Sequence, residues 1–284
     1  MYPSKFDYVR AQSVEEAVER TSSHSNAKIL AGGHSLIPAL KLRLAQPDLL
    51  VDLGRIDALK GISRHNGTVS VGALTTHAAC AASDDLPKVW SEAAGLIGDP
   101  QVRNRGTVGG NIAHADPASD LPTVLIALGA QIHVQGAAGP RAIPADEFFV
   151  DLFTTSLEEG EIITRVEVPV ESNQGSAYTK VFNPASRYAI LGVAAQVTIA
   201  GGVCRQLRVA AGGSTPKAIR AHHVEAALQG QPLNDTTIQH AAAAIADDLG
   251  EEVIGDMYAS AAYRRSIAAQ ITARALSAAA ARAR

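Results

Sequence analysis

Two glycine-rich segments limit what this chain can fold into more than any other feature of its sequence. The first has the sequence AGGHS at residues 31–35, and the second has TVGGN at residues 107–111. Adjacent glycines let the backbone adopt positive φ and come close to a ligand. The amide N–H groups of such a segment can converge on an anion at the start of a helix. We therefore predict two loops that together hold the pyrophosphate of a dinucleotide cofactor.

Each segment also has simpler interpretations. Taken alone, residues 31–35 could form a helix-capping turn with nothing bound. Neither segment has the G-x-G-x-x-G pattern of a Rossmann fold, and the sequence contains no G-x-x-x-x-G-K-[ST] phosphate loop. Gly33-His34-Ser35 is similar to the start of a nucleophile elbow, but Ile37 stands where that motif needs glycine. A standard NAD fold, a P-loop NTPase and a serine hydrolase are therefore disfavoured.

A run of polar residues, HADPASD at residues 114–120, interrupts an apolar stretch. His114, Asp116 and Asp120 have side chains of the types that ligate metal ions. Asp120 could instead cap the helix that follows, with Asp116 stabilising the loop. In a third interpretation, an aspartate accepts hydrogen bonds from the ribityl or ribose hydroxyls of the cofactor. The last two interpretations are favoured, and they are compatible with each other.

A second polar loop, NPASRYA at residues 183–189, precedes a long apolar run. Aromatic residues make up only 4% of the chain, so Tyr188 in this loop is notable. Its ring could stack on a planar ligand or belong to an ordinary core. The physics of the sequence alone favours the core residue.

Hydrophobic periodicity and turn residues predict a chain of mixed helices and strands. Strands are expected at residues 28–31, 49–53, 132–135, 162–168, 178–182, 190–199 and 203–211, with a hairpin turn at Asn66-Gly67. Helices are expected at residues 14–20, 36–44, 76–82, 87–95, 120–128, 218–228, 237–249 and 259–283, with Ser13 and Ser35 as caps. The last helix places Tyr263, Ile267 and Ile271 on one face, as a docking stripe. A polar stretch near residues 171–176 predicts a boundary, giving subdomains at 1–55 and 56–172 and a C-terminal domain at 173–284.

Composition excludes several classes of protein. The 284 residues carry 25 Lys and Arg against 28 Asp and Glu, a net charge of −3 that disfavours nucleic-acid binding. Only two cysteines are present, so an iron–sulfur or zinc site with four cysteine ligands must lie on a partner. The N-terminal residues contain no apolar signal segment, and the uncharged stretch at 188–204 reads as a buried strand and turn. We therefore expect that the chain has no transmembrane segment and that the protein is cytoplasmic.

The two glycine segments and the two polar loops together resemble the FAD-binding medium subunits of the molybdenum hydroxylases. That family includes the medium chain of aerobic carbon monoxide dehydrogenase and the flavin segment of xanthine dehydrogenase. The resemblance rests on residues 31–36, 107–120 and 184–189, and the order of domains fits over essentially the whole chain. It implies an α+β fold in which two subdomains of the vanillyl-alcohol-oxidase (PCMH) type bind FAD between them. A C-terminal domain with a three-stranded antiparallel sheet and helices would close the site.

The resemblance also implies roles for matched residues. Residues 30–37 and 107–111 would wrap the adenine side and the pyrophosphate, and Asp120 would bind cofactor hydroxyls. Ile163 and Lys180 would line the flavin, and Tyr188 would lie against the isoalloxazine ring. Arg187 stands where many carbon monoxide dehydrogenase-like members have glycine. The full expected FAD-binding set is Leu30, Ala31, Gly32, Gly33, His34, Ser35, Leu36, Ile37, Thr107, Val108, Gly109, Gly110, Asn111, Asp116, Asp120, Ile163, Lys180 and Tyr188. No catalytic or metal-binding residue is expected in this chain.

By the same resemblance, the chain is an electron-relay subunit in a dimer of heterotrimers. A large subunit with a molybdenum–pterin cofactor would oxidise the substrate, and a small subunit with [2Fe–2S] clusters would pass electrons to FAD here. An external acceptor would then take them, which could bring the complex to the inner face of the membrane. Carbon monoxide, a purine, an N-heterocycle and an aldehyde are all open as substrates.

Two other functions are weighed beside the relay. A self-contained FAD-dependent oxidase or reductase would need its own substrate pocket and a proton donor, for which Tyr188, Lys180 and His114 are the candidates. A nucleotide-binding scaffold without redox function is disfavoured by the intact glycines of both segments.

Overall fold

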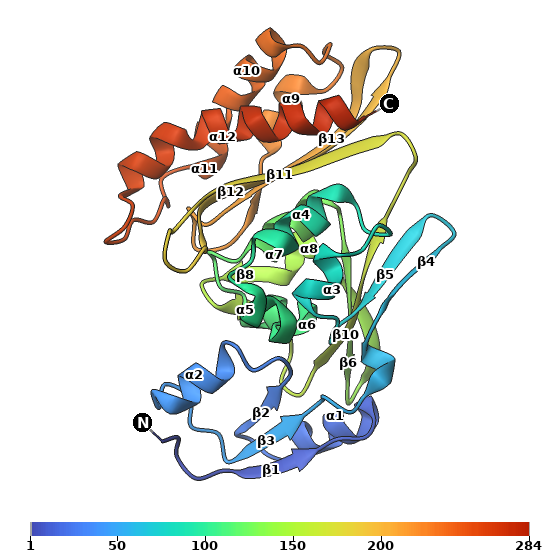
Figure 1. Cartoon of the computed structure of the whole chain (residues 1–284), viewed down its shortest axis with the longest axis vertical. Helices are drawn as coiled ribbons and strands as arrows, with labels where there is room; N and C mark the ends of the chain where they lie inside the picture. Colours follow the sequence, from blue (N-terminus) through green and yellow to red (C-terminus); the bar gives the residue numbers. More distant parts are fainter. Residues whose placement is uncertain (1, 284) are drawn as a thin grey trace.

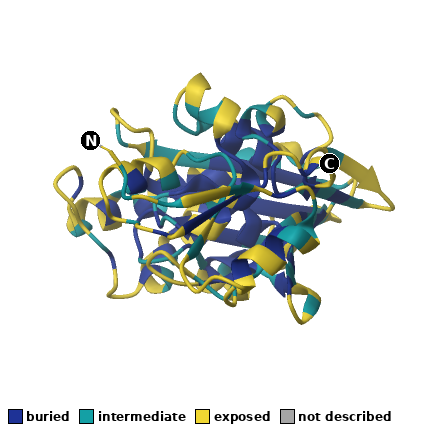
Figure 2. Cartoon of the chain, turned by 90° about the horizontal axis from the view of Figure 1, so that it is seen from below, coloured by how far each residue is buried: buried dark blue, intermediate teal, exposed yellow. Residues whose placement is uncertain are grey.

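The computed structural model describes residues 2–283 and arranges them as three units stacked along the long axis of the molecule (Figure 1). The N-terminal unit lies at one end, and the C-terminal unit, with the long last helix, lies at the other. A five-stranded sheet and its helices form the central unit. Buried residues concentrate in the strands and helices between the layers, whereas the connecting loops are exposed (Figure 2).

The N-terminal unit is a small parallel sheet with the strand order β1-β3-β2. Its elements are β1 (Asp7–Arg10), α1 (Val14–Ser22), β2 (Ala27–Leu30), α2 (Leu36–Lys41) and β3 (Leu49–Asp52). Helix α1 is capped as predicted, because the Ser13 side chain accepts a hydrogen bond from the Glu16 amide. Because the strands are parallel, their carboxyl ends meet at one edge, where ligand-binding loops gather. The first glycine segment starts at this edge, directly after β2.

The central unit is an antiparallel sheet with the order β4-β5-β10-β6-β7. Its elements are η1 (Asp57–Leu59), β4 (Ile62–His65), β5 (Thr68–Gly72), α3 (His77–Ala81), α4 (Lys88–Leu96), α5 (Pro100–Arg105), α6 (Val108–His114), α7 (Asp120–Ala127), β6 (Gln131–Gly136), β7 (Gly139–Pro144), α8 (Ala145–Phe148), β8 (Phe149–Asp151), β9 (Thr154–Thr155) and β10 (Ile162–Pro169). The predicted hairpin turn is present, with positive φ at both Asn66 and Gly67. Trp90 of α4 and Leu121 of α7 are fully buried in the core beside this sheet.

The prediction that residues 107–111 form a loop is wrong. Gly109 and Gly110 lie in the first turn of α6, which follows the equally unexpected helix α5. Glycine has a low helix propensity, which is why the sequence favoured a loop. Capping and tertiary contacts override that preference, because the Thr107 side chain accepts a hydrogen bond from the Gly110 amide and Gly109 packs tightly on Ala73.

The C-terminal unit is an antiparallel sheet with the order β11-β12-β13-β14, covered by helices. Its elements are β11 (Gln174–Phe182), β12 (Ala189–Ala200), β13 (Val203–Gly212), β14 (Ile219–Arg220), α9 (His222–Leu228), α10 (Asp235–Ala243), α11 (Ile245–Leu249) and α12 (Ala261–Arg282). Helices α4 and α7 pack on one face of β11–β13, and α12 covers β11 and β12 from the C-terminal unit's own side. Burial on both faces explains the unbroken apolar run in β12.

Three expectations for this unit need correction. The three long strands are joined by β14, a short edge strand, so the helix predicted from residue 218 begins only at His222. The helix predicted over 237–249 is two helices, α10 and α11. The docking stripe on α12 is incomplete, because Ile271 is buried but Tyr263 remains 46% exposed.

The predicted division at residues 55 and 172 falls in the connections between β3 and β4 and between β10 and β11. It stays a prediction about domains. Among the described residues, no helix is both long enough and apolar enough to cross a membrane.

Candidate cofactor site

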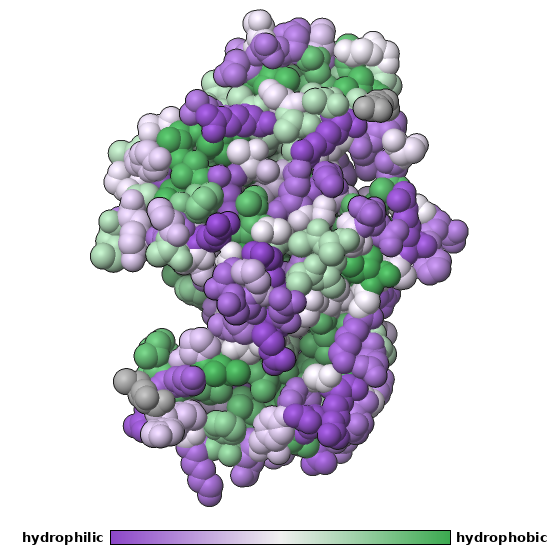
Figure 3. Space-filling view, in the orientation of Figure 1, coloured by the Kyte–Doolittle hydropathy of each residue, from purple (hydrophilic) through white to green (hydrophobic). Residues whose placement is uncertain are grey.

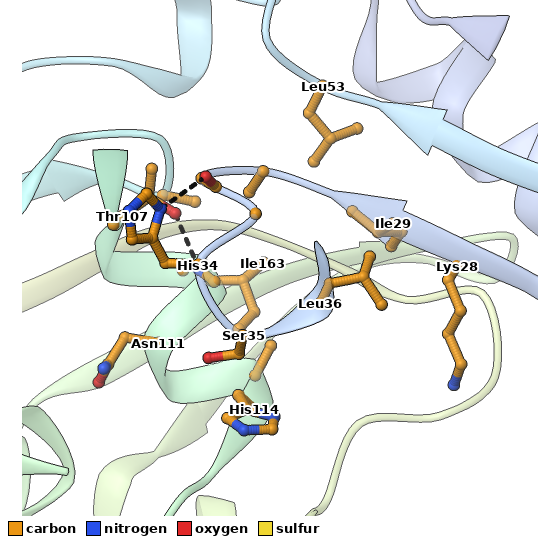
Figure 4. Close-up of a pocket in the computed structure, with 18 of the residues that line it drawn as sticks. Lys28, Ile29, His34, Ser35, Leu36, Leu53, Thr107, Asn111, His114 and Ile163 are labelled. Carbon is orange, nitrogen blue, oxygen red and sulfur yellow. Dashed lines mark hydrogen bonds between the residues drawn. The ribbon is translucent and has the colours of Figure 1, made fainter. Parts of the chain in front are cut away.

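A cavity of about 890 Å³ lies between the N-terminal unit, the central unit and the 183–188 loop of the C-terminal unit. In the space-filling view the surface is hollowed between the N-terminal unit and the rest of the molecule (Figure 3). The close-up shows the first glycine segment lying beside the start of α6, with His34, Ser35, Thr107 and Asn111 around the same space (Figure 4). A cavity of this size and mixed lining is typical of a small-molecule or cofactor site.

The first glycine segment lines this cavity, and its backbone amides are not used inside the protein. Within the described part of the chain, no acceptor is found for the amide N–H groups of Gly32, Gly33, His34, Ser35 and Leu36. The predicted cap at Ser35 is also wrong, because its side chain makes no capping hydrogen bond and stays available. Such a run of free donors is what a pyrophosphate needs, since hydrogen bonds to charged oxygens are the strong ones.

Close backbone packing requires the two glycines of the first segment. A Cβ on Gly32 would overlap the carbonyl oxygen of Arg105, which precedes the second segment. Gly33 has a φ of +78°, a conformation that favours glycine, and a Cβ there would lie 2.7 Å from the Ile37 side chain. The first segment is therefore held directly against the start of the second.

The second glycine segment uses most of its amides inside the protein. Val108 donates to the Thr75 carbonyl at 3.0 Å, Gly109 donates to the Ala73 carbonyl at 2.8 Å, and Asn111 donates to the Thr107 carbonyl at 3.0 Å. The Asn111 side-chain oxygen accepts a hydrogen bond from Ser119 Oγ at 2.7 Å. The segment thus lines the cavity but offers it fewer backbone donors than predicted.

Asp120 forms a buried cluster with two residues of β11. Lys180 Nζ lies 2.8 and 3.0 Å from the two Asp120 carboxylate oxygens, and Tyr178 Oη donates to Asp120 Oδ1 at 2.6 Å. Burial raises the pKa of the Asp120 carboxyl, while the Lys180 ammonium and the Tyr178 hydroxyl oppose that rise. Asp120 is the first residue of α7 and follows the N-cap position at Ser119, so its predicted capping role is wrong.

Tyr188 lies on the rim of the cavity, in the loop that joins β11 to β12. Its side chain is 42% exposed, so it is not the ordinary core residue that sequence physics favoured. Partial burial raises the pKa of the Tyr188 hydroxyl, and the carboxylates of Asp116 and Asp120 add to the effect. The loop is tied to the buried cluster, because the Arg187 carbonyl accepts a hydrogen bond from Lys180 Nζ at 2.7 Å.

The polar run at 114–120 is not arranged as a metal site. The His114 ring packs against Phe153 at 5.2 Å between centroids, Asp116 accepts a hydrogen bond from the Ala118 amide, and Asp120 points to β11. Across residues 2–283, no group of three or more His, Cys, Asp or Glu side chains is placed to hold a metal ion.

Thirteen of the eighteen expected residues line the cavity. The five that do not are Leu30, Ile37, Val108, Asp116 and Lys180. Among them, Lys180 has a defined indirect role, because its side chain is 1% exposed and anchors Asp120 and the rim loop.

Sequence reasoning missed several cavity residues, of which His77 is the most notable. His77 is 2% exposed, and its backbone amide donates to the Gly106 carbonyl at 3.0 Å. Burial lowers the pKa of His77 from 6.5 to about 4, with a smaller contribution from His34. The sequence predicted a helix over residues 76–82, but the contact of His77 with Gly106, about thirty residues away, had no local signal. The other missed lining residues include Thr21, His24, Asn26, Lys28, Glu158 and Glu159.

Two family models match the chain. Residues 4–171 match the model described as the FAD binding domain in molybdopterin dehydrogenase, and residues 176–279 match the CO dehydrogenase flavoprotein C-terminal domain.

Relatives of known name match over nearly their full lengths. The glyceraldehyde dehydrogenase medium chain of Sulfolobus acidocaldarius is 38% identical over 97% of this chain and 98% of its own length. The carbon monoxide dehydrogenase medium chain of Hydrogenophaga pseudoflava is 40% identical over 99% of each. A chain in the solved structure of carbon monoxide dehydrogenase from Hydrogenophaga pseudoflava superimposes with a TM-score of 0.95 over 100% of both chains, at 40% identity.

Proposed function

Because this chain belongs to the family of FAD-binding medium subunits of molybdenum hydroxylases, we propose that it relays electrons through FAD held in this cavity. Small-subunit [2Fe–2S] clusters would supply the electrons, and an external acceptor would remove them. Substrate oxidation would occur at the molybdenum–pterin site of the large subunit. The proposal rests on residues 32–36, which line the cavity and whose backbone amides have no acceptor inside the protein.

The residues present fit FAD. The five free amides and the Ser35 hydroxyl match the donor needs of a pyrophosphate, and the glycines leave room for its close approach. Asp120 can still accept hydrogen bonds from cofactor hydroxyls, because each carboxylate oxygen has more than one acceptor site. When bound, FAD supplies the redox chemistry, and the protein supplies binding, orientation and tuning.

The remaining expected residues divide into those that touch the cofactor and those that position others. Ile163 of β10 and Tyr188 on the rim both line the cavity, which supports their expected contact with the flavin ring. Lys180 holds Asp120 and the rim loop in place, and Asp116 holds its own loop. Leu30 and Ile37 lie against the backbone of Gly33, and Val108 is fully buried.

Large and small subunits accompany the medium chains of this family's complexes. We further propose that this chain assembles as a dimer of heterotrimers in the cytoplasm. Sedimentation of the complex purified with both partners tests the stoichiometry, since a single heterotrimer would contradict the dimer.

Flavin binding tests the core of the proposal. The purified full-length chain should be yellow, or should take up FAD at micromolar concentration with quenching of flavin fluorescence. No uptake of FAD, alone or with the partner subunits, would overturn the proposal. Reduction of bound FAD by a small substrate without partners would instead identify a self-contained oxidase or reductase.

A further inference from the structure

Arg187 occupies a strained position at the rim of the cavity. Its φ is +62°, in the left-handed region that favours glycine. The backbone around it is nevertheless held by hydrogen bonds within the loop. The Asn183 amide donates to the Tyr188 carbonyl at 2.9 Å, and the Arg187 amide donates to the Asn183 carbonyl at 2.8 Å. The loop therefore keeps an arginine where the backbone geometry would favour a glycine.

The backbone and the side chain of Arg187 are both fixed. Its carbonyl oxygen accepts the hydrogen bond from buried Lys180, which ties the loop to the protein interior. Its guanidinium lies over the Phe182 ring, 5.5 Å from the centroid, in cation–π geometry. A positive charge is thus held at the mouth of the cavity.

This charge has no acidic partner in the protein. Among residues 2–283, no carboxylate lies within 4.0 Å of the Arg187 guanidinium, whereas Arg208 and Arg264, for example, have such partners. Asp120, the buried carboxylate near the loop, already faces the Lys180 ammonium. The other cavity carboxylates near solvent, Glu158 and Glu159, belong to the segment that runs beside α1.

We propose that Arg187 binds an anionic group, a carboxylate or a phosphate, on the electron acceptor that reoxidises the flavin. This inference rests on the proposed function and names the charge class of the acceptor. With ferricyanide as the model anion, two ferricyanide ions each take one electron from one two-electron-reduced flavin. The flavin releases two protons to solvent, and no bond forms between the acceptor and the protein.

Reoxidation kinetics of the FAD-loaded full chain test the inference. After reduction with dithionite, Arg187→Glu should slow reoxidation by ferricyanide by about tenfold, because a favourable local field becomes repulsive. Reoxidation by the cation N-methylphenazinium should not slow. Arg187→Gly, which suits the positive φ, should give an intermediate rate, and Arg187→Lys should stay near the original rate.

Arg205→Glu is the matched control, because it makes the same charge change at an exposed site on β13 that does not line the cavity. It should alter both rates by less than about twofold. Equal slowing with the anionic and the cationic acceptor, or an equal effect of Arg187→Glu and Arg205→Glu, would overturn the inference.

A binding measurement separates this inference from the proposed function. Ferrocyanide cannot accept an electron, so its binding to the chain, measured by calorimetry with and without FAD, reports anion recognition alone. Binding should be lost in Arg187→Glu and kept in Arg187→Lys. If the chain takes up FAD but its affinity for ferrocyanide is the same in the original chain and in Arg187→Glu, the acceptor inference is wrong. The proposed electron relay is then unaffected. Failure to take up FAD contradicts the relay itself.

Discussion

The two glycine-rich segments are alike in sequence, but their backbone amides differ in whether they form hydrogen bonds within the protein. In the first, residues 32–36 line the cavity and their amides have no acceptor in the described chain. In the second, the amides of Val108, Gly109 and Asn111 bond to carbonyl groups of the protein. Adjacent glycines therefore do not by themselves indicate a ligand-binding loop. In one segment they leave donors free for a ligand, and in the other they allow a helix to pack closely on its neighbours.

The largest effect that we expect concerns His77, which lies where the two segments meet. Between pH 6.5 and about 4 the unfolded chain binds a proton at this residue and the folded chain does not. The contribution of His77 to the free energy of unfolding is therefore complete above pH 6.5. It falls by about 3 kcal/mol as the pH drops toward 4. Urea unfolding across this range should show the loss of stability. In His77→Gln, the part of this pH dependence that comes from His77 should be absent.

Carboxylates also become protonated in acid and change the stability. The test is therefore the difference in pH dependence between the original protein and His77→Gln. An NMR titration of the original protein gives a second readout, in which the His77 ring signals should not move above about pH 5. A normal titration near pH 6.5 would contradict the buried, neutral His77.

The second effect separates packing from binding. In Gly109→Ala the new Cβ would lie 2.7 Å from the Ala73 side chain and 3.0 Å from its carbonyl oxygen. Such overpacking should lower the free energy of unfolding by about 2 kcal/mol, measured on the FAD-free chain. Gly110→Ala is the control, since its close contact is the tip of the Thr107 side chain. If both variants lose the same stability, the inference that Gly109 is required for close packing on Ala73 is wrong.

The third effect belongs to the first segment. Gly33→Ala forces alanine to a φ of +78°, so the free amides should lose their common orientation. We expect the Kd for FAD to rise roughly tenfold, which is about 1.4 kcal/mol, in a fluorescence titration.

Gly139→Ala is a matched control, because Gly139 also has positive φ, at +110°, but sits in the β6–β7 hairpin with nothing near its Cβ position. It should reduce stability and leave the affinity for FAD unchanged. If Gly33→Ala keeps the original affinity, the first segment does not bind the pyrophosphate.

The smallest effect is expected for Ser35. Its hydroxyl makes no capping bond and lines the cavity, so Ser35→Ala should weaken FAD binding by about 1 kcal/mol while stability stays the same. If stability falls and affinity does not, Ser35 has a structural role that the observed hydrogen bonds do not show.

Local patterns predicted the parts of this fold that depend on local physics. The capping serine of α1, the Asn66-Gly67 turn and the three long C-terminal strands each followed from neighbouring residues. Helix α6 did not, because its first turn is stabilised by hydrogen bonds from Val108 to Thr75 and from Gly109 to Ala73 rather than by glycine's own propensity.

The site divides in the same way. The glycines and Tyr188 could be identified from their own segments, and they line the cavity. The Lys180–Asp120 pair joins residues sixty positions apart. Its geometry depends on the packing of α7 against β12 and β13 of the C-terminal sheet, which no pattern within either segment records.

The place of β10 has a consequence for synthesis of the chain. This strand lies between β5 and β6, although it follows both in sequence. While the ribosome has made only the residues before Ile162, β5 and β6 each expose an unpaired edge, and such edges favour aggregation. The central sheet can close only when residues 162–169 have left the exit tunnel. We therefore expect nascent chains that stop before β10 to depend on chaperones, and protection of the central core to appear abruptly once that strand is free.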